Sequence, residues 1–137
     1  MLEEYVFLKE SGLLITRHLG PFVGAEFQEA IVEILPNLEC LPSAFLADVR
    51  EVDDAGMKDS DRAKVAHTIR KLDEYRPEAG TTLVQAATFI ALANRDADVT
   101  RRLQIMVDQN IFLAHCYFAE DWEEVWRILG FTLKPPW

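Results

Sequence analysis

Residues 43–57 read SAFLADVREVDDAGM and combine a short apolar run with an acidic turn. The run Ser43–Val49 follows Pro42 and is typical of a buried strand, because strands covered on both faces are apolar along their length. The acidic turn Glu51–Gly56 contains a glycine, and we expect it to lead into a helix. This stretch therefore predicts one strand-to-helix unit of an α/β fold.

The residues before this unit predict a β-hairpin and then a helix. Segments 5–10 and 13–19 are rich in apolar residues and flank Ser11-Gly12, as in two strands joined by a tight turn. Over residues 23–38, apolar side chains recur at three- and four-residue steps opposite a stripe of glutamates, which indicates an amphipathic helix. We expect Pro21 in the first turn of this helix, where its missing N–H has no cost.

The residues after the unit continue the alternation of helices and strands. Helical periodicity covers residues 57–74, 98–107 and 121–130, and apolar strand-like runs cover 81–92 and 111–118. For residues 81–92 the pattern also allows a helix that starts near Gln85. The last helix carries the clearest end signals, because acids occupy its first turn and a glycine follows it.

The complete pattern predicts a single domain over residues 1–130 with a C-terminal tail, residues 131–137. The element order is β-β-α-β-α-β-α-β-α. Consecutive strand-helix-strand units favour parallel pairing with right-handed crossovers. We therefore expect one central sheet, mainly parallel after the hairpin, flanked by helices.

The net charge of −9 lies mainly in the first part of the chain. Residues 1–57 hold 3 basic and 11 acidic side chains (net −8), whereas residues 58–137 hold 11 and 12 (net −1). A polyanion would meet like charge without releasing counterions, so we expect neither nucleic acid nor an anionic membrane as a partner. No run approaches the roughly 20 apolar residues of a membrane span, and no signal-peptide pattern is visible.

The two cysteines favour a reducing compartment. Cys40 and Cys116 are far apart in sequence and have apolar neighbours, which is typical of buried free thiols. We therefore expect a cytoplasmic protein.

Residues that carry catalysis or bind metals do not converge in the sequence. His18, His67 and His115 are far apart, and neither Cys-x-x-Cys nor His-x-x-x-His spacing occurs, so we expect no metal site. The glycines form none of the phosphate-binding loop motifs, and we expect no cofactor. The sequence therefore favours a protein that is not an enzyme.

The tryptophans raise a separate question about the tail. Trp122 and Trp126 share one helix face with apolar neighbours, as core aromatics do. Trp137 lies on the tail, and its burial requires either a docked tail or a second subunit. Self-association through Trp137 and the neighbouring residues 131–133 would give a homodimer.

The run Asp48–Met57, taken with the element order, resembles the STAS domain, the fold of bacterial anti-sigma-factor antagonists and of the cytoplasmic tails of sulfate transporters. In that family the turn has the form Asp-x-x-x-x-Asp-Ser-Ser/Thr-Gly-Leu, and a partner kinase phosphorylates its first serine. The two aspartates and the glycine match, whereas Asp54 and Ala55 occupy the hydroxyl positions. The C-terminal half is also similar to uncharacterised bacterial STAS-like proteins, through Arg101 or Arg102 and the segment Phe118–Leu129.

The resemblance implies a regulatory protein-binding domain that lacks the phosphoacceptor serine, with a kinase-like anti-sigma factor or another regulator as its partner. Asp54 would then act as a permanent, weaker phosphoserine, with about one negative charge against about 1.5 to 2. Alternatively, Asp53 or Asp54 only caps the helix. Ser60 is the one nearby hydroxyl that could replace the missing serine. The expected binding surface consists of Asp53, Asp54, Ala55, Gly56, Lys58, Asp61, Lys64, Arg70 and Lys71.

A small-molecule or lipid-binding module is the alternative function, because STAS-like folds can carry an apolar pocket beneath a mobile helix. Phe89, Leu103, Met106 and Phe112 are the candidate lining residues. The same four side chains could equally fill the core, and the sequence leaves both functions open.

Overall fold

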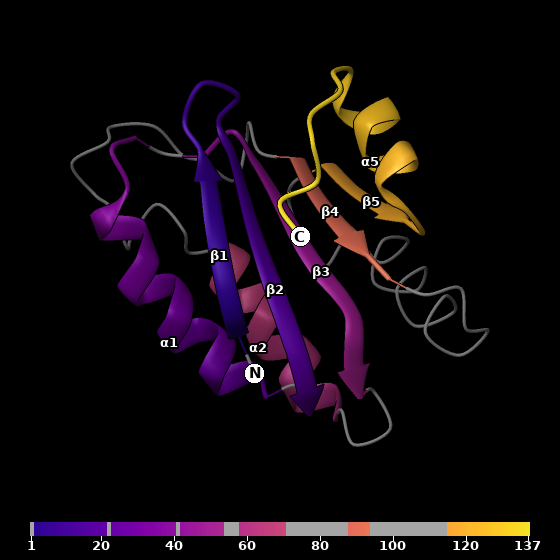
Figure 1. The fold of residues 1–137 in the computed structure, drawn as a ribbon. Coiled ribbons are helices and arrows are strands. Elements are labelled where there is room, and N and C mark those ends of the chain that lie inside the picture. The colour runs from indigo at the N-terminus through magenta and orange to yellow at the C-terminus, as the bar shows by residue number, and fades with distance from the viewer. Residues whose placement is uncertain (1, 22, 41, 54–57, 71–87, 94–114) are drawn as a thin grey trace.

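The computed structural model describes residues 2–21, 23–40, 42–53, 58–70, 88–93 and 115–137. Within these residues, five strands form one sheet with helices on both of its faces (Figure 1). The strands are β1 (Leu2–Leu8), β2 (Leu13–Pro21), β3 (Ala44–Asp53), β4 (Thr88–Leu92) and β5 (His115–Ala119). The helices are α1 (Gly24–Ile34), the 3₁₀ turn η1 (Leu35–Asn37), α2 (Asp59–Arg70) and α5 (Trp122–Leu129).

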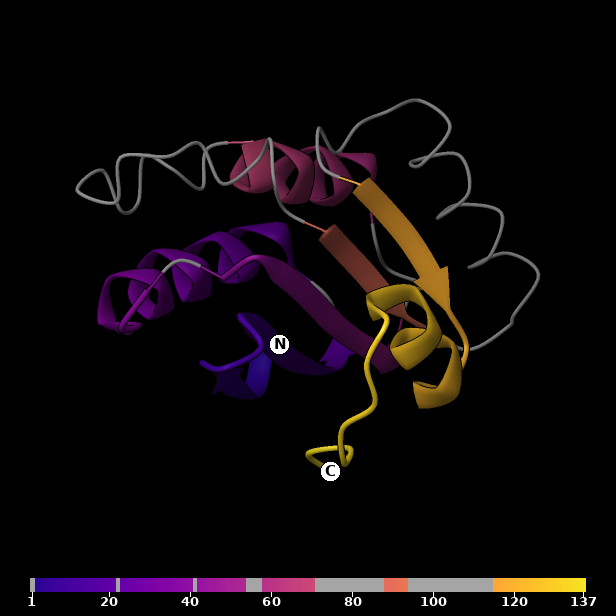
Figure 2. The same ribbon diagram turned by 90° about the horizontal axis from the view of Figure 1, so that it is seen from above.

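The strands lie side by side in chain order, from β1 to β5. β1 pairs antiparallel with β2, and every later pair is parallel. This confirms the predicted α/β fold with a hairpin and a mainly parallel sheet. Right-handed crossovers that step in one direction across a sheet place their helices on one face. Figure 2 accordingly shows α1 and α2 on one face, and α5 with the C-terminal segment on the other. We call these the α1/α2 face and the α5 face.

The hairpin turn also aligns the first parallel strand pair. The Gly12 carbonyl accepts the N–H groups of Ser43, at 2.8 Å, and Ala44, at 3.1 Å. Gly12 has φ 65°, and a Cβ there would lie 2.5 Å from the Ser43 Oγ. The positive φ therefore favours glycine at this position, and any side chain here would also require the Ser43 hydroxyl to move.

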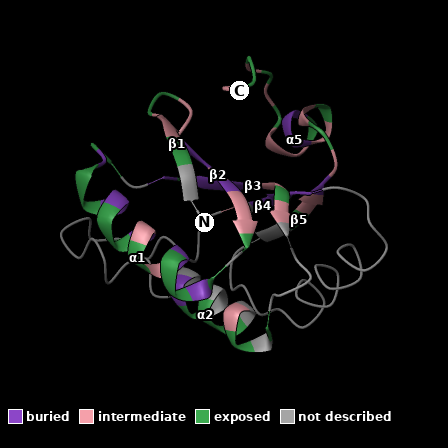
Figure 3. Ribbon diagram, turned by 60° about the horizontal axis from the view of Figure 1, so that its bottom comes forward, coloured by how far each residue is buried: buried purple, intermediate pink, exposed green. Residues whose placement is uncertain are grey.

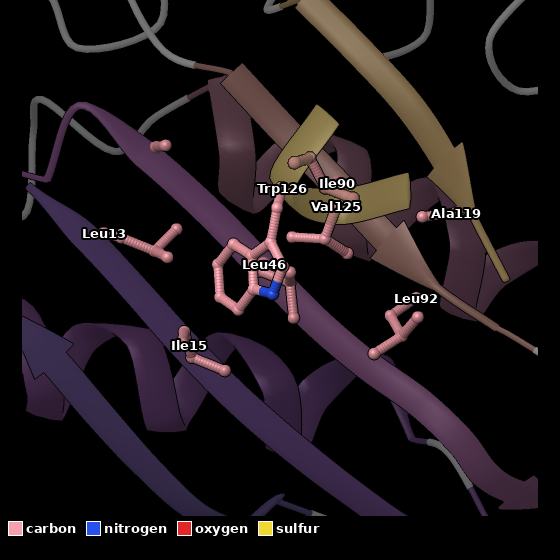
Figure 4. Close-up of a cluster of buried hydrophobic side chains, with 9 residues drawn as sticks. Leu13, Ile15, Leu46, Ile90, Leu92, Ala119, Val125 and Trp126 are labelled. Carbon is pink, nitrogen blue, oxygen red and sulfur yellow. The ribbon is translucent and has the colours of Figure 1, made fainter. Parts of the chain in front are cut away.

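A hydrophobic cluster joins α5 to the sheet (Figure 4). Val125 and Trp126 of α5 pack on alternate residues of four neighbouring strands, because every second side chain of a strand points to the same face. The sheet residues of the cluster are Leu13, Ile15, Ala44, Leu46, Ile90, Leu92 and Ala119. The expected core role of Trp126 is thus confirmed, and Trp122 packs against the rim of the cluster.

The ends of α5 follow the predicted signals. The Asp121 carboxylate accepts the Glu124 N–H at 2.9 Å and caps the helix. Gly130 ends it with φ 82° and donates its N–H to the Trp126 carbonyl at 2.8 Å.

Two predicted boundaries around β2 and β3 are wrong. Pro21 is the last residue of β2, opposite Asp53, and α1 begins only at Gly24. Residues 51–53 belong to β3 and not to a turn, because the parallel pairing continues past an irregularity that lies between Arg17 and Leu19 on β2. An extra residue in β3 at this bulge keeps the two strands paired to their ends.

Other expectations have mixed outcomes. Cys40 is a free thiol but is exposed, so its predicted burial is wrong; it follows η1 in the connection to β3, outside the hydrophobic core. The Cys116 side chain and the predicted helix 98–107 lie outside the described residues, as do the outer parts of the runs 81–92 and 111–118. No helix in the described part of the chain is long and apolar enough to cross a membrane.

Candidate functional site

The structure describes part of the predicted binding surface, where β3 ends and α2 begins. Asp53 ends β3, Lys58 directly precedes α2, and Arg70 ends α2. Lys58 and Lys64 are exposed. Four members of the predicted surface, Asp54, Ala55, Gly56 and Lys71, lie outside the described residues.

Asp61 ties the start of α2 to the start of α1. One oxygen of its carboxylate accepts the backbone N–H of Lys58 at 3.0 Å, and the other accepts the N–H of Gly24 at 3.0 Å. A carboxylate in the first turn of a helix that accepts the preceding backbone N–H forms one half of a capping box and interacts well with the helix dipole. Asp61 belongs to the expected partner surface, and in this structure its carboxylate accepts two hydrogen bonds from within the chain.

Gly24 lets the two helices approach closely at this junction. A Cβ at Gly24 would lie 2.7 Å from the Asp61 carbonyl oxygen and 2.9 Å from the Lys64 Cβ. Backbone and Cβ atoms cannot move aside as the end of a flexible side chain can, so the junction depends on a residue without a side chain.

The outer sides of α1 and α2 are largely exposed (Figure 3), and exposed side chains of opposite charge lie near this junction. Glu26 and Glu29 are exposed on α1, and Lys58 and Lys64 are exposed at the start of α2. Val23, next to the junction, is 40% exposed. We call these five residues the helix-pair surface.

A second polar centre lies around Asp48 on β3, which is only 3% exposed. Arg50 donates Nε to Oδ1 and Nη2 to Oδ2, both at 2.9 Å, and its backbone N–H reaches Oδ1 at 3.2 Å. The indole Nε1–H of Trp137 donates to Oδ2 at 2.9 Å. Four donors therefore satisfy this buried carboxylate. Trp137 is partly buried because the C-terminal tail docks on its own chain.

Cationic and aromatic side chains surround the docked indole. The Arg17 guanidinium carbon lies 5.8 Å from the centroid of the Trp137 ring, and Arg17 also pairs with Glu4 at 3.0 Å. Trp122 meets Trp137 edge-on, with ring centroids 6.5 Å apart. We call Asp48, Arg17 and Trp122 the Trp137 seat. Arg50 holds Asp48 in place through its hydrogen bonds to the carboxylate.

The hydrogen bonds of the seat control the ionisation of Asp48. Burial raises the pKa of its carboxyl, but the hydrogen bonds from Arg50 and Trp137 outweigh burial and hold the pKa below its usual range. Asp48 is therefore ionised at neutral pH, as an acceptor of four hydrogen bonds should be.

A buried histidine lies near the carboxyl end of β2. His18 is 2% exposed, and its Nε2 shares a hydrogen bond of 2.9 Å with the Thr16 Oγ1. Its ring lies 6.0 Å from that of Phe27 of α1. Burial lowers the pKa of His18 to about 4, so its imidazole is neutral at pH 7.

The Trp137 seat was missed because its parts are distant in sequence. Asp48 and Trp137 are 89 residues apart, and no local pattern connects them. The available signals were the isolated Trp137 and the spacing of Asp48 and Arg50, which places both side chains on one side of a strand.

The candidate pocket residues lie outside the described side chains, so the alternative function stays a prediction. Phe89 lies in β4, but its side chain and the other pocket candidates, Leu103, Met106 and Phe112, are outside the description. Across the described ranges, no three His, Cys, Asp or Glu side chains gather as metal ligands.

Comparisons with known proteins do not place the chain in a family: no protein-family model and no curated protein sequence matches it. The likeness to STAS domains therefore rests on the Asp48–Met57 run, the element order and the C-terminal features described above.

Proposed function

We propose that the chain is a regulatory domain that works by binding a protein partner through the helix-pair surface and the adjoining turn. The observation that carries the proposal is the double hydrogen bond of Asp61 to Lys58 and Gly24. It holds the start of α2 at a fixed position while the lysine side chains around it face outward.

A fixed junction favours binding because less freedom is lost when a partner docks. Immobilising a long side chain at an interface costs about 0.5–1.5 kcal/mol, and ordering a loop adds to this cost. The close contact at Gly24 and the capping by Asp61 order the backbone before the partner arrives.

The charges define the partner that fits. Lys58 and Lys64 attract acidic side chains, and Glu26 and Glu29 attract basic ones, so a partner with both signs in the matching arrangement is favoured over a uniformly charged one. Val23 offers an apolar contact beside the junction. Exposed pairs of this kind mainly set the association rate and the salt dependence, because salt screens them over roughly 8 to 10 Å.

Residues 54–57, which connect β3 to α2 in sequence, set the expected regulation. Asp54 and Ala55 stand where STAS turns have hydroxyl side chains, so the proposed binding does not depend on phosphorylation at those positions. A partner such as an anti-sigma factor or another regulator would bind the chain constitutively.

The test compares matched charge reversals in the full chain. Immobilised wild type, Lys64→Glu and Lys134→Glu are used to capture proteins from the source cell, and each captured protein is quantified by mass spectrometry. Lys134 is exposed on the tail, away from α1 and α2. The captured amount of a protein that binds the helix-pair surface should fall on the order of tenfold with Lys64→Glu, since opposing like charges are strongly unfavourable at an interface. It should be unchanged with Lys134→Glu. Equal recovery of every captured protein by all three baits would show that the helix-pair surface is not the binding site.

A further inference from the structure

We infer that the Trp137 seat is a recognition site for an extended Pro-Trp segment of a protein partner, and that the chain's own tail occupies it in cis. The inference concerns the α5 face, so it is independent of the binding proposed for the helix-pair surface.

The seat has one acceptor position directed at an incoming indole. Arg50 supplies three of the four donors to Asp48, and the Trp137 indole supplies the fourth, at 2.9 Å. With the ring in place the Asp48 side chain is 4% exposed, so a docked ring without an N–H would cover this acceptor without satisfying it. A buried acceptor that loses its donor pays the full desolvation cost, and the seat therefore selects an aromatic ring with an N–H over one without.

The walls of the seat add contacts that suit the same ring. The Arg17 guanidinium lies over the Trp137 ring, and Trp122 meets it edge-on. Cation–π and edge-to-face contacts both favour a large indole. Tryptophan and arginine are also the residue types most enriched where binding energy concentrates in interfaces.

The occupant has the properties of a preformed ligand. Residues 134–137 read Lys-Pro-Pro-Trp. Each proline fixes its own φ and restricts the residue before it to extended conformations, which favours the polyproline II form. Proline-rich segments of this form dock on surfaces lined by aromatic residues at low entropic cost. A partner segment that binds the seat should therefore resemble the tail, with a tryptophan that follows proline in an extended conformation.

The tail and a partner segment would compete for the seat. A segment attached through a short linker has an effective concentration on the order of 1 mM. A free peptide that binds the open seat with a dissociation constant of about 10 to 100 µM would therefore bind the intact chain roughly 10- to 100-fold more weakly, because the closed state dominates. Trp137 itself is only partly buried, so the tail is accessible to displacement.

The test opens the seat in the full chain by Trp137→Ala. A fluorescein-labelled peptide of sequence Thr-Leu-Lys-Pro-Pro-Trp, which repeats residues 132–137, is titrated with wild type, with Trp137→Ala and with Asp48→Asn/Trp137→Ala, and fluorescence anisotropy is recorded. A second peptide ending in Phe lacks the indole N–H. Circular dichroism checks that each variant is folded, and Trp137→Phe replaces Trp137→Ala if the alanine variant is not.

We expect the Trp peptide to bind Trp137→Ala at least tenfold more tightly than wild type, and to lose most of that gain with the Phe peptide or with Asp48→Asn. Lys64→Glu should leave this binding unchanged, which separates the seat from the helix-pair surface. Absence of binding to a folded variant, or equal binding of the Trp and Phe peptides, would overturn the inference.

Discussion

Replacing Trp137 by phenylalanine removes the indole N–H from Asp48 while keeping an aromatic ring on the tail. Hydrogen bonds to charged groups contribute about 1.5–3 kcal/mol, and the lower end applies because Arg50 still holds the carboxylate. For 137 residues, an unfolding entropy of about 2.1 cal/mol/K per residue converts 1 kcal/mol into about 3.5 °C of Tm. We therefore expect Trp137→Phe to lower Tm by about 5 to 7 °C.

The assay is thermal unfolding at pH 7, followed by circular dichroism, with Trp122→Phe as the matched control. That control removes the same atoms, but the Trp122 indole N–H has no hydrogen bond among the described contacts. Phenylalanine at position 122 keeps an aromatic ring for the contacts with Trp126 and Trp137, whose ring centroids lie 5.4 and 6.5 Å away. It weakens the contact with Arg50, 5.8 Å from the ring centroid, which contributes on the order of 0.5–1 kcal/mol. Asp48→Asn combined with Trp137→Phe should be non-additive by about 1 kcal/mol, as expected of residues in contact. A Tm loss in Trp137→Phe no larger than in Trp122→Phe would refute the reasoning.

Three further predictions concern the helices and the buried histidine. Stability should fall by on the order of 3 kcal/mol between pH 6.5 and 4, because the unfolded state takes up a proton that folded His18, with its pKa lowered to about 4, does not; denaturant melts of His18→Gln should show a flatter pH profile. Gly24→Ala should cost about 1–3 kcal/mol by urea unfolding, because its Cβ would meet the Asp61 carbonyl at 2.7 Å; unchanged stability would contradict the close helix junction. Asp121→Ala should cost about 1 kcal/mol through the lost cap of α5, and Asp121→Asn should restore most of it in the same melts.

Local signals were sufficient to predict the elements that have clear ends. α5 was predicted correctly because acids, apolar spacing and a glycine all lie within ten residues of sequence. The Ser11-Gly12 turn was likewise readable, since the tight hairpin needs positive φ. Parallel pairing followed from the alternation of strands and helices.

The errors arose where tertiary pairing overrides local preference. Pro21 suits a first helical turn, yet it ends β2 because β3 pairs with that strand up to Asp53. Cys40 has apolar neighbours in sequence but lies in a connection outside the core. Sequence proximity to apolar residues therefore does not establish burial.

In the candidate sites, too, local patterns were predictable and contacts between distant segments were not. Helical periodicity predicted Lys64 on the outer face of α2, and Lys64 is exposed. The role of Asp61 depends on Gly24, 37 residues away, and the Trp137 seat joins β2, β3, α5 and the tail. Contacts between such distant segments exist only once the sheet has brought them together.

Both the position of the C-terminal segment on the α5 face and the inferred recognition role of the Trp137 seat depend on the docking of Trp137 on Asp48. The most direct measurement is the indole N–H resonance of Trp137 in ¹⁵N-labelled full-length protein, assigned with Trp137→Phe. We predict that this N–H exchanges slowly with solvent and that Asp48→Asn shifts its resonance far more than that of Trp126. Exchange at the rate of a free indole, together with no response to Asp48→Asn, would contradict the docked tail.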